Sequence, residues 1–194
     1  MVKEMTLRIG IDFDNTIVDY RPVFLPAAHA LGLLDTAFGD ADKTAIRDRL
    51  RAQPGGEDRW QLLQAHVYGV AIDMAPAYAG LERFIAGARA RGAQLAIVSH
   101  KSRFAAAAPA GADLQVAAHD WLLARGIVGA QGVAADAVYF EQTRAAKLER
   151  VRALGLTHFI DDLADVLEDA AFPPATRAIR FCESWDAVYD DVLA

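Results

Sequence analysis

The sequence contains a single cysteine, Cys182, among its 194 residues. A lone cysteine cannot form an internal disulfide or a thiolate metal cluster, and no neighbouring residue indicates an activated thiol. This scarcity excludes disulfide scaffolds and cysteine-ligated zinc proteins. We expect Cys182 to be a small, buried apolar side chain.

Two further absences limit where the protein works and what it binds. No stretch of 18 apolar residues occurs, and residues 1–6 lack the apolar core of a signal peptide, so we expect a cytoplasmic protein with no membrane partner. An excess of basic residues is also missing. The net charge of -6 argues against a protein whose main task is to bind a nucleic acid polymer. Small anionic molecules remain candidate partners, and the oligomeric state is left open.

Hydrophobic residues make up 54% of the chain, which fits a globular domain with a large core and room for an inserted subdomain. Short apolar runs alternate with amphipathic helical segments over most of its length. Strands are predicted at residues 6–13, 95–98, 137–140, 158–160 and 178–181. Helices are predicted at 81–91, 113–124, 143–154, from 161 to about 170, and at the end of the chain. This alternation predicts a Rossmann-like, doubly wound α/β fold, with a parallel sheet covered on both faces.

Residues 19–79 interrupt the alternation with helical patterns only. The helical segments are 26–34, 40–53 and 57–70, and Asp40 is a plausible N-cap of the second. Trp60, Leu63 and Val67 share one face of the third, so we expect these helices to pack together. The chain is thus divided into an α/β core, residues 1–18 and 80–194, and a helical insertion, residues 19–79. Within the core, the stretch Ala105–Ala108 is predicted to be a mobile loop or a short helix.

The first predicted strand ends in the run Asp12-Phe13-Asp14-Asn15-Thr16. Strand side chains two apart share a face, so Asp12 and Asp14 can leave the strand as a pair. Two like charges about 4 Å apart repel by roughly 4 kcal/mol at an effective dielectric of about 20. The pair therefore needs a cation, a retained proton or separation by a turn. A solvated turn is the plainest alternative, whereas a calcium loop is excluded because Ile17 and Val23 stand where it needs Gly and Glu.

Polar groups stand at three predicted strand ends: Asp12 with Asp14, Ser99, and Asp161 with Asp162. In open parallel sheets the ligand crevice lies beyond these carboxyl ends. Converging carboxylates without Cys or His form an all-oxygen site that suits Mg²⁺ better than Zn²⁺. We expect Asp12, the Asp14 backbone carbonyl and Asp161 to be the inner ligands. Since Mg²⁺ usually shares phosphate oxygens with its protein site, a phosphorylated substrate is the natural partner.

A carboxylate near such a cation can serve as the nucleophile of phosphoryl transfer. Asp12, the first carboxylate after the strand, is the predicted nucleophile and would form an aspartyl-phosphate. Asp14 is predicted to protonate the leaving alkoxide and then to accept a proton from the hydrolytic water. The proton on Asp14 would make the carboxylate pair tolerable.

Four ordered motifs resemble those of the haloacid dehalogenase (HAD) superfamily, in its phosphatase branch. Residues 12–16 are similar to the first motif, DxDx[TV], in which the first Asp is the nucleophile and the second the acid/base. Ser99 resembles the second motif's hydroxyl, Lys147 the third motif's lysine, and the run 160–165 the acidic fourth motif. The resemblance implies that Ser99 donates to phosphate and that Lys147 compensates the charge of phosphate and nucleophile. It also implies that the fourth motif holds Mg²⁺ and that the helical insertion is a type 1 cap.

Several assignments within this resemblance stay open. The residues assigned to substrate binding are Thr16, Ser99, His100 and Lys101. Lys101 is also the rival of Lys147, because it closely follows Ser99 and could reach the phosphate or the leaving group. His100 could help to select the leaving group.

The metal ligands are also partly open: the candidates are Asp12, Asp14, Asp161, Asp162 and Asp165. Asp161 is the expected direct ligand of the fourth motif, whereas Asp162 or Asp165 could bind through water or orient Lys147. The run 161–165 also spells DDxxD, the diphosphate motif of isoprenoid synthases. The strand predicted at 158–160 excludes the long helix that those enzymes use.

The sequence thus predicts a magnesium-dependent phosphatase acting on a small phosphorylated metabolite, a sugar phosphate or a nucleotide, through an aspartyl-phosphate. One alternative is a phosphosugar mutase with the same intermediate, and another is a non-catalytic partner-binding protein that kept the fold. A dehalogenase is disfavoured, because Asp14 supplies a proton that a leaving halide does not need.

Overall fold

The computed structural model describes residues 6–106 and 111–194, which form two compact units. The α/β unit contains the described residues within 1–18, 77–101 and 122–194, and the helical unit contains those within 19–76 and 102–121. The helical unit thus includes a segment, 102–121, that the sequence analysis had grouped with the α/β core. Of the stretch Ala105–Ala108, the first two residues are not helical, and the last two lie outside the described residues.

The α/β unit is built on a five-stranded parallel sheet with the order β3-β2-β1-β4-β5. Its strands are β1 (Arg8–Ile11), β2 (Gln94–His100), β3 (Val138–Glu141), β4 (His158–Asp161) and β5 (Arg177–Arg180). Ile11 of the central strand stands opposite Ile97 and Ile160. The carboxyl ends of β1, β2 and β4 therefore come together at one edge of the sheet, where ligands bind in such folds.

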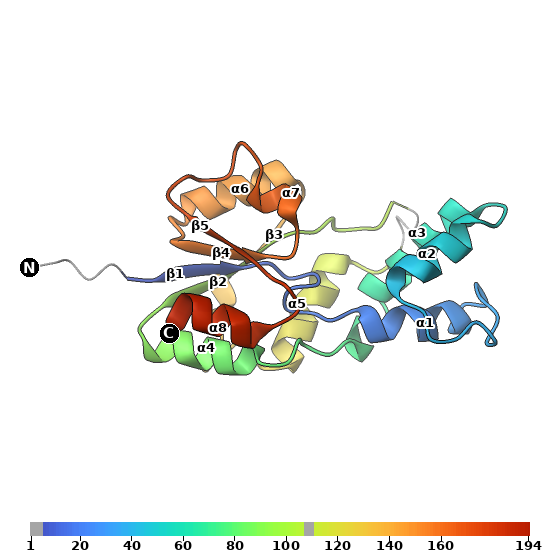
Figure 1. The fold of residues 1–194 in the computed structure, drawn as a ribbon, viewed down its shortest axis with the longest axis horizontal. Coiled ribbons are helices and arrows are strands. Elements are labelled where there is room, and N and C mark those ends of the chain that lie inside the picture. Colours follow the sequence, from blue (N-terminus) through green and yellow to red (C-terminus); the bar gives the residue numbers. More distant parts are fainter. Residues whose placement is uncertain (1–5, 107–110) are drawn as a thin grey trace, which may run out of the picture. The chain divides into compact units, whose positions relative to one another are not determined.

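Helices cover both faces of this sheet, which confirms the predicted doubly wound fold. Figure 1 shows α6 (Arg144–Ala153) and α7 (Ala164–Leu167) on one face and α4 (Leu81–Ala90) and α8 (Trp185–Leu193) on the other. A 3-10 turn, η2 (Ala135–Ala137), precedes β3. The helix predicted to reach about residue 170 ends at Leu167, because the Asp169 side chain accepts a hydrogen bond from the Ala171 N–H and forms a turn instead.

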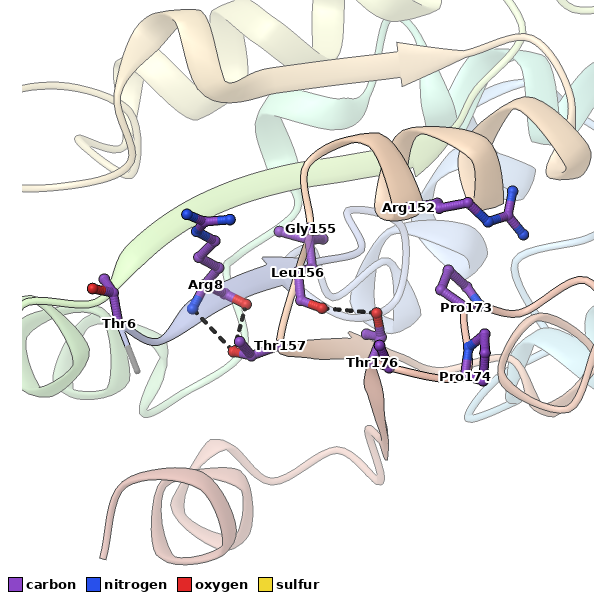
Figure 2. A pocket seen from close by; sticks show the side chains of 10 residues that line it. Thr6, Arg8, Arg152, Gly155, Leu156, Thr157, Pro173, Pro174 and Thr176 are labelled. Atoms are coloured by element: carbon purple, nitrogen blue, oxygen red, sulfur yellow. Dashed lines mark hydrogen bonds between the residues drawn. The ribbon is translucent and has the colours of Figure 1, made fainter. Parts of the chain in front are cut away.

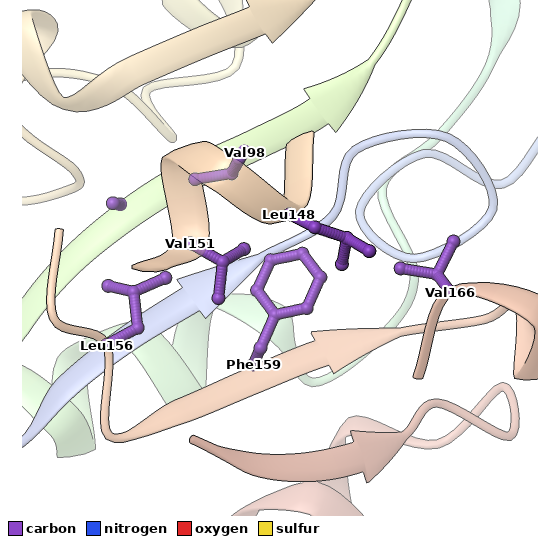
Figure 3. Packing of buried hydrophobic residues seen from close by; sticks show 7 residues of the cluster. Val98, Leu148, Val151, Leu156, Phe159 and Val166 are labelled. Carbon is purple, nitrogen blue, oxygen red and sulfur yellow. The ribbon is translucent and has the colours of Figure 1, made fainter. Parts of the chain in front are cut away.

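A hydrophobic cluster fixes α6 against the sheet. Its buried members come from β2, β4, α6, α7 and the turn before β4: Ala96, Val98, Leu148, Val151, Leu156, Phe159 and Val166. Figure 3 shows Leu148 and Val151 packed toward the ring of Phe159. The burial of Leu148 and Val151 turns this face of α6 toward the sheet. It also fixes the position of Lys147, the residue before Leu148.

Gly10 in the central strand allows neighbouring side chains to pack closely against the backbone. A Cβ at this position would collide with Leu156 Cδ1 and would lie 2.8 Å from Phe159 Cδ2. We therefore expect Gly10→Ala to lower the free energy of unfolding by about 1–3 kcal/mol, because overpacking forces the core to shift. Urea unfolding measures this difference. Gly39→Ala is the matched control, since a Cβ there meets no atom within 4 Å, and an equally small effect of both changes would contradict the prediction.

The helical unit contains α1 (Arg21–Ala30), α2 (Lys43–Arg51), α3 (Gly56–Tyr68), the 3-10 turn η1 (Ile72–Met74) and most of α5 (Leu114–Ala124). Helix α1 begins five residues before the predicted start, since Pro22 is tolerated in a first helical turn. The buried side chains of Trp60, Leu63 and Val67 confirm the predicted packing face of α3. Phe24 of α1 stacks on Trp60 with ring centroids 5.5 Å apart.

Two local predictions were wrong. The N-cap of α2 is Asp42, whose Oδ1 accepts a 2.7 Å hydrogen bond from the Ala45 N–H, whereas Asp40 lies outside the helix with a φ of 37°. Cys182 is exposed rather than buried, because buried and exposed side chains alternate along this extended stretch and the alternate position belongs to Phe181, which is buried. Among the described residues, no helix is both long and apolar enough to cross a membrane.

Candidate active site

A buried lysine joins the ends of β1 and β4. Lys147 Nζ on α6 donates to Asp12 Oδ1 and to Asp161 Oδ2, at 2.6 Å each. All three side chains are at most 5% exposed. The Asp12 N–H donates to the Ile160 carbonyl at 2.9 Å, and Asp161 Oδ1 accepts from the Leu163 N–H at 2.8 Å. These bonds fix the two carboxylates beside one ammonium group.

The second carboxylate of the first motif has a lysine of its own. Lys101 Nζ donates to both carboxylate oxygens of Asp14, at 2.9 and 3.1 Å. Asp12 and Asp14 therefore tolerate each other because each is paired with a separate cation. The sequence pattern predicted a retained proton on Asp14, whereas the structure pairs Asp14 with Lys101.

Burial shifts the pKa values of this cluster. It raises the pKa of Asp12 from 3.8 to about 7, because desolvation outweighs the favourable charge of Lys147, and Asp161 adds to the rise. Burial also raises the pKa of Asp162 to about 6, with Asp161 as the next cause. For Lys147, burial lowers the pKa, but Asp12 and Asp161 together outweigh burial and raise it above 10.5. A cation bound beside Asp12 and Asp162 would lower these raised pKa values and favour the ionised carboxylates.

Asp12, Asp161 and Asp162 form a group that could hold a metal ion, since each offers a carboxylate oxygen within 4.8 Å of the others. An all-oxygen donor set fits a hard cation such as Mg²⁺ and not a thiolate or imidazole metal. Of the two ligands left open by the sequence, Asp162 belongs to this group. Asp165 lines the nearby cavity but is exposed and outside the group, and metal binding by the Asp14 carbonyl stays a prediction.

The carboxylates face a cavity of about 400 Å³ within the α/β unit. Its lining includes Asp12, Asp14, Lys147, Asp162 and Asp165 from the predicted set, together with Ser99 and His100. Ser99 is buried in the wall of this cavity. His100 is exposed, and its Nε2 is 3.1 Å from the Gln142 carbonyl. Because a carbonyl only accepts, Nε2 carries the hydrogen of this bond.

Two residues assigned to substrate binding are not in this lining. Lys101 contacts Asp14 instead, and Thr16 is buried, with its Oγ1 lacking a hydrogen-bond partner among the described residues. The Thr16 carbonyl accepts from the Trp185 indole N–H at 3.1 Å. Substrate contact by either residue stays a prediction.

The cavity also contains residues that sequence reasoning missed: Asn15, Arg144, Leu163 and Val166. Arg144 precedes Lys147 by three positions on α6, so the i, i+3 spacing that places two side chains on one helix face could have identified it. Its guanidinium interacts with Asp169 at 3.2 Å and donates to the Asp165 carbonyl at 3.4 Å. Asn15 has a φ of 57°, which asparagine tolerates better than most residues.

A larger cavity, of about 570 Å³, lies at the amino ends of the strands (Figure 2). Among the described residues, its lining contains no carboxylate. Two of the hydroxyls drawn there already form hydrogen bonds: Thr157 with the Arg8 backbone and Thr176 with the Leu156 carbonyl. The converging titratable groups are therefore in the smaller cavity, and we assign the candidate active site to it.

Comparison with known proteins identifies the fold. No family model matches the sequence, and no curated protein matches it significantly. A hydrolase from Streptococcus pneumoniae TIGR4 has a TM-score of 0.62 and 12% identity, covering 96% of this chain and 98% of that one. A HAD-superfamily hydrolase of subfamily IA, variant 1, from Geobacter sulfurreducens PCA has a TM-score of 0.55 and 12% identity, covering 97% of each chain.

A haloacid dehalogenase-like family hydrolase from Streptococcus pneumoniae is also similar, with a TM-score of 0.53 and 14% identity over 95% of this chain and 98% of that one. The chain therefore has the α/β fold of HAD-superfamily hydrolases. This agreement confirms the fold that the four motifs implied. The identity of the helical unit as a type 1 cap stays a prediction.

Proposed function

We propose that the protein is a magnesium-dependent phosphatase that hydrolyses a small phosphorylated metabolite through a phosphorylated Asp12. The observation that carries the proposal is the Lys147 ammonium, which lies 2.6 Å from both Asp12 and Asp161 in the wall of one cavity. Asp162 completes an oxygen donor set suited to Mg²⁺. A cavity of about 400 Å³ is of the size that holds small ligands, which favours a metabolite over a polymer.

Each protein group has a role in this reaction. Asp12 Oδ attacks the phosphorus, the ester P–O bond breaks, and Asp14 gives a proton to the leaving oxygen. Asp14 then accepts a proton from the water that attacks the aspartyl-phosphate, which releases phosphate and regenerates the Asp12 carboxylate. Lys147 offsets charge on the nucleophile and phosphate, and the Ser99 hydroxyl donates to a phosphate oxygen. Asp12, Asp161 and Asp162 would hold the cation, which when bound would neutralise charge on the phosphate oxygens.

The test is phosphate release from p-nitrophenyl phosphate and from a panel of sugar phosphates and nucleotides, with Mg²⁺ or with EDTA. We expect turnover of at least one ester with Mg²⁺, loss of that activity in EDTA, and recovery when excess Mg²⁺ is added back. Activity that persists through exhaustive chelation would contradict the metal assignment.

The same panel separates the alternatives. Isomerised sugar phosphate without released phosphate would replace the phosphatase with a mutase. Chloride release from chloroacetate without phosphatase activity would indicate a dehalogenase. No turnover of any substrate would favour a non-catalytic protein that kept the fold.

A further inference from the structure

The Lys101 side chain is buried beside the carboxylate that the proposed reaction uses as acid and base. Lys101 is 4% exposed, whereas the Asp14 side chain is 26% exposed. The Lys101 backbone N–H donates to the Glu141 carbonyl at 2.8 Å, which continues the pairing of β2 with β3. Its ammonium also lies 5.3 Å from the ring centroid of Phe13, a distance typical of a cation–π contact. The backbone and the ring thus fix Lys101 in place.

The cavity and the ion pair define which group meets the substrate. Asp14 lines the cavity, but Lys101 does not appear in the described lining. Among the described residues, Asp14 and not Lys101 therefore forms the wall of this cavity. A lysine in this position acts on the substrate through Asp14.

We propose that Lys101 is a positioning residue that holds the Asp14 carboxyl in the direction needed for proton transfer to the leaving oxygen. The inference rests on the proposed function and deepens it. An ammonium group has three hydrogens and can keep one carboxylate oxygen while the other carries the transferred proton. Proton transfer requires heavy atoms within about 3 Å. Free rotation of the Asp14 carboxyl would therefore slow the reaction without weakening substrate binding.

Leaving-group chemistry provides a sharp test. p-Nitrophenolate leaves with little help from an acid, whereas the alkoxide of an alkyl phosphate needs a proton. kcat/KM reports the steps up to departure of the leaving group and is independent of the later hydrolysis of the phosphoenzyme. The experiment measures kcat/KM with p-nitrophenyl phosphate and with glycerol 2-phosphate, or the best sugar phosphate of the panel. The proteins are the wild type, Lys101→Met, Asp14→Asn and the double variant.

We expect Lys101→Met to lose at least about tenfold more kcat/KM with the alkyl phosphate than with p-nitrophenyl phosphate, the same pattern as Asp14→Asn. We also expect the loss to fall on kcat rather than KM. In the Asp14→Asn background, the Lys101→Met change should add less than about twofold, because residues that act as one unit are not additive. Lys101→Gln, which keeps a polar donor, is measured in parallel in case Lys101→Met does not fold.

Equal losses with both substrates, or losses that multiply in the double variant, would overturn the inference and make Lys101 a direct phosphate contact. Unchanged activity of a folded Lys101 variant would also overturn it. These results require an active wild-type protein. Absence of wild-type turnover would instead reject the proposed function, so the two failures are distinguishable.

Discussion

Asp12→Asn is expected to lower the rate of phosphate release by at least about a thousandfold, because an amide cannot replace the carboxylate nucleophile. The Asn side chain keeps nearly the same volume, and Lys147 keeps its 2.6 Å ion pair with Asp161. The assay is Mg²⁺-dependent phosphate release with the best substrate of the panel. Residual activity near that of the wild type would remove Asp12 from the nucleophile role.

The same variant should be more stable than the wild type at alkaline pH without metal. Burial raises the pKa of Asp12 to about 7, so the folded protein binds this proton more tightly than the unfolded chain does. The resulting stability is present below pH about 4 and is lost as the pH rises through about 7. Asn has no such loss. In EDTA, thermal unfolding should therefore favour Asp12→Asn at pH 8, with a difference that shrinks toward pH 4.

The pair of results separates chemistry from folding. An inactive variant that is also less stable at pH 8 would mean that the structure, and not the nucleophile, was lost. Asp186→Asn is the matched control: this exposed carboxylate pairs with Arg83 at 2.6 Å on the surface. It should leave both activity and stability close to those of the wild type.

The parts of the candidate site that depend on a local sequence pattern were predictable. Alternation along a strand placed Asp12 and Asp14 together, and the apolar run before Ser99 marked the end of β2. The choice between Lys147 and Lys101 was not predictable, because Lys147 in the first turns of α6 and Lys101 directly after β2 both lie near the site. Contact between Lys101 and Asp14 spans 87 positions in sequence and depends on side-chain direction, which no spacing encodes.

The boundaries of the two units also depend on contacts between residues distant in sequence, which local patterns do not predict. The strand and helix alternation predicted the sheet, but it could not assign the segment 102–121 to the helical unit. That assignment follows from long-range contacts, such as the hydrogen bond from the Trp121 indole N–H to the Ala75 carbonyl at 3.0 Å. A tryptophan on an amphipathic helix indicates burial, but it does not show whether the α/β unit or the helical unit buries the side chain.

Lys147→Met is expected to destabilise the metal-free protein by about 3–5 kcal/mol at pH 7.5, because it leaves buried Asp12 and Asp161 without their shared cation. Urea unfolding in EDTA measures the loss. Activity should also fall sharply, since the remaining charge on the nucleophile repels the substrate phosphate. Arg152→Met is the matched control on the same helix: its half-exposed guanidinium lies 3.9 Å from Glu149 and donates to the Ala171 carbonyl at 2.8 Å, so only the small loss of exposed contacts is expected.

Two conditions should reduce the defect of Lys147→Met if its cause is the uncompensated charge. At pH 5 Asp12, whose pKa burial raises to about 7, can take up a proton, so the difference from the wild type should be smaller than at pH 7.5. Mg²⁺ should raise the stability of the variant more than that of the wild type, because the ion would bring positive charge to carboxylates that have none. A loss of stability that is equal at both pH values and insensitive to Mg²⁺ would indicate a packing defect instead. Such a result would remove the central role of Lys147 in balancing the charge of the site.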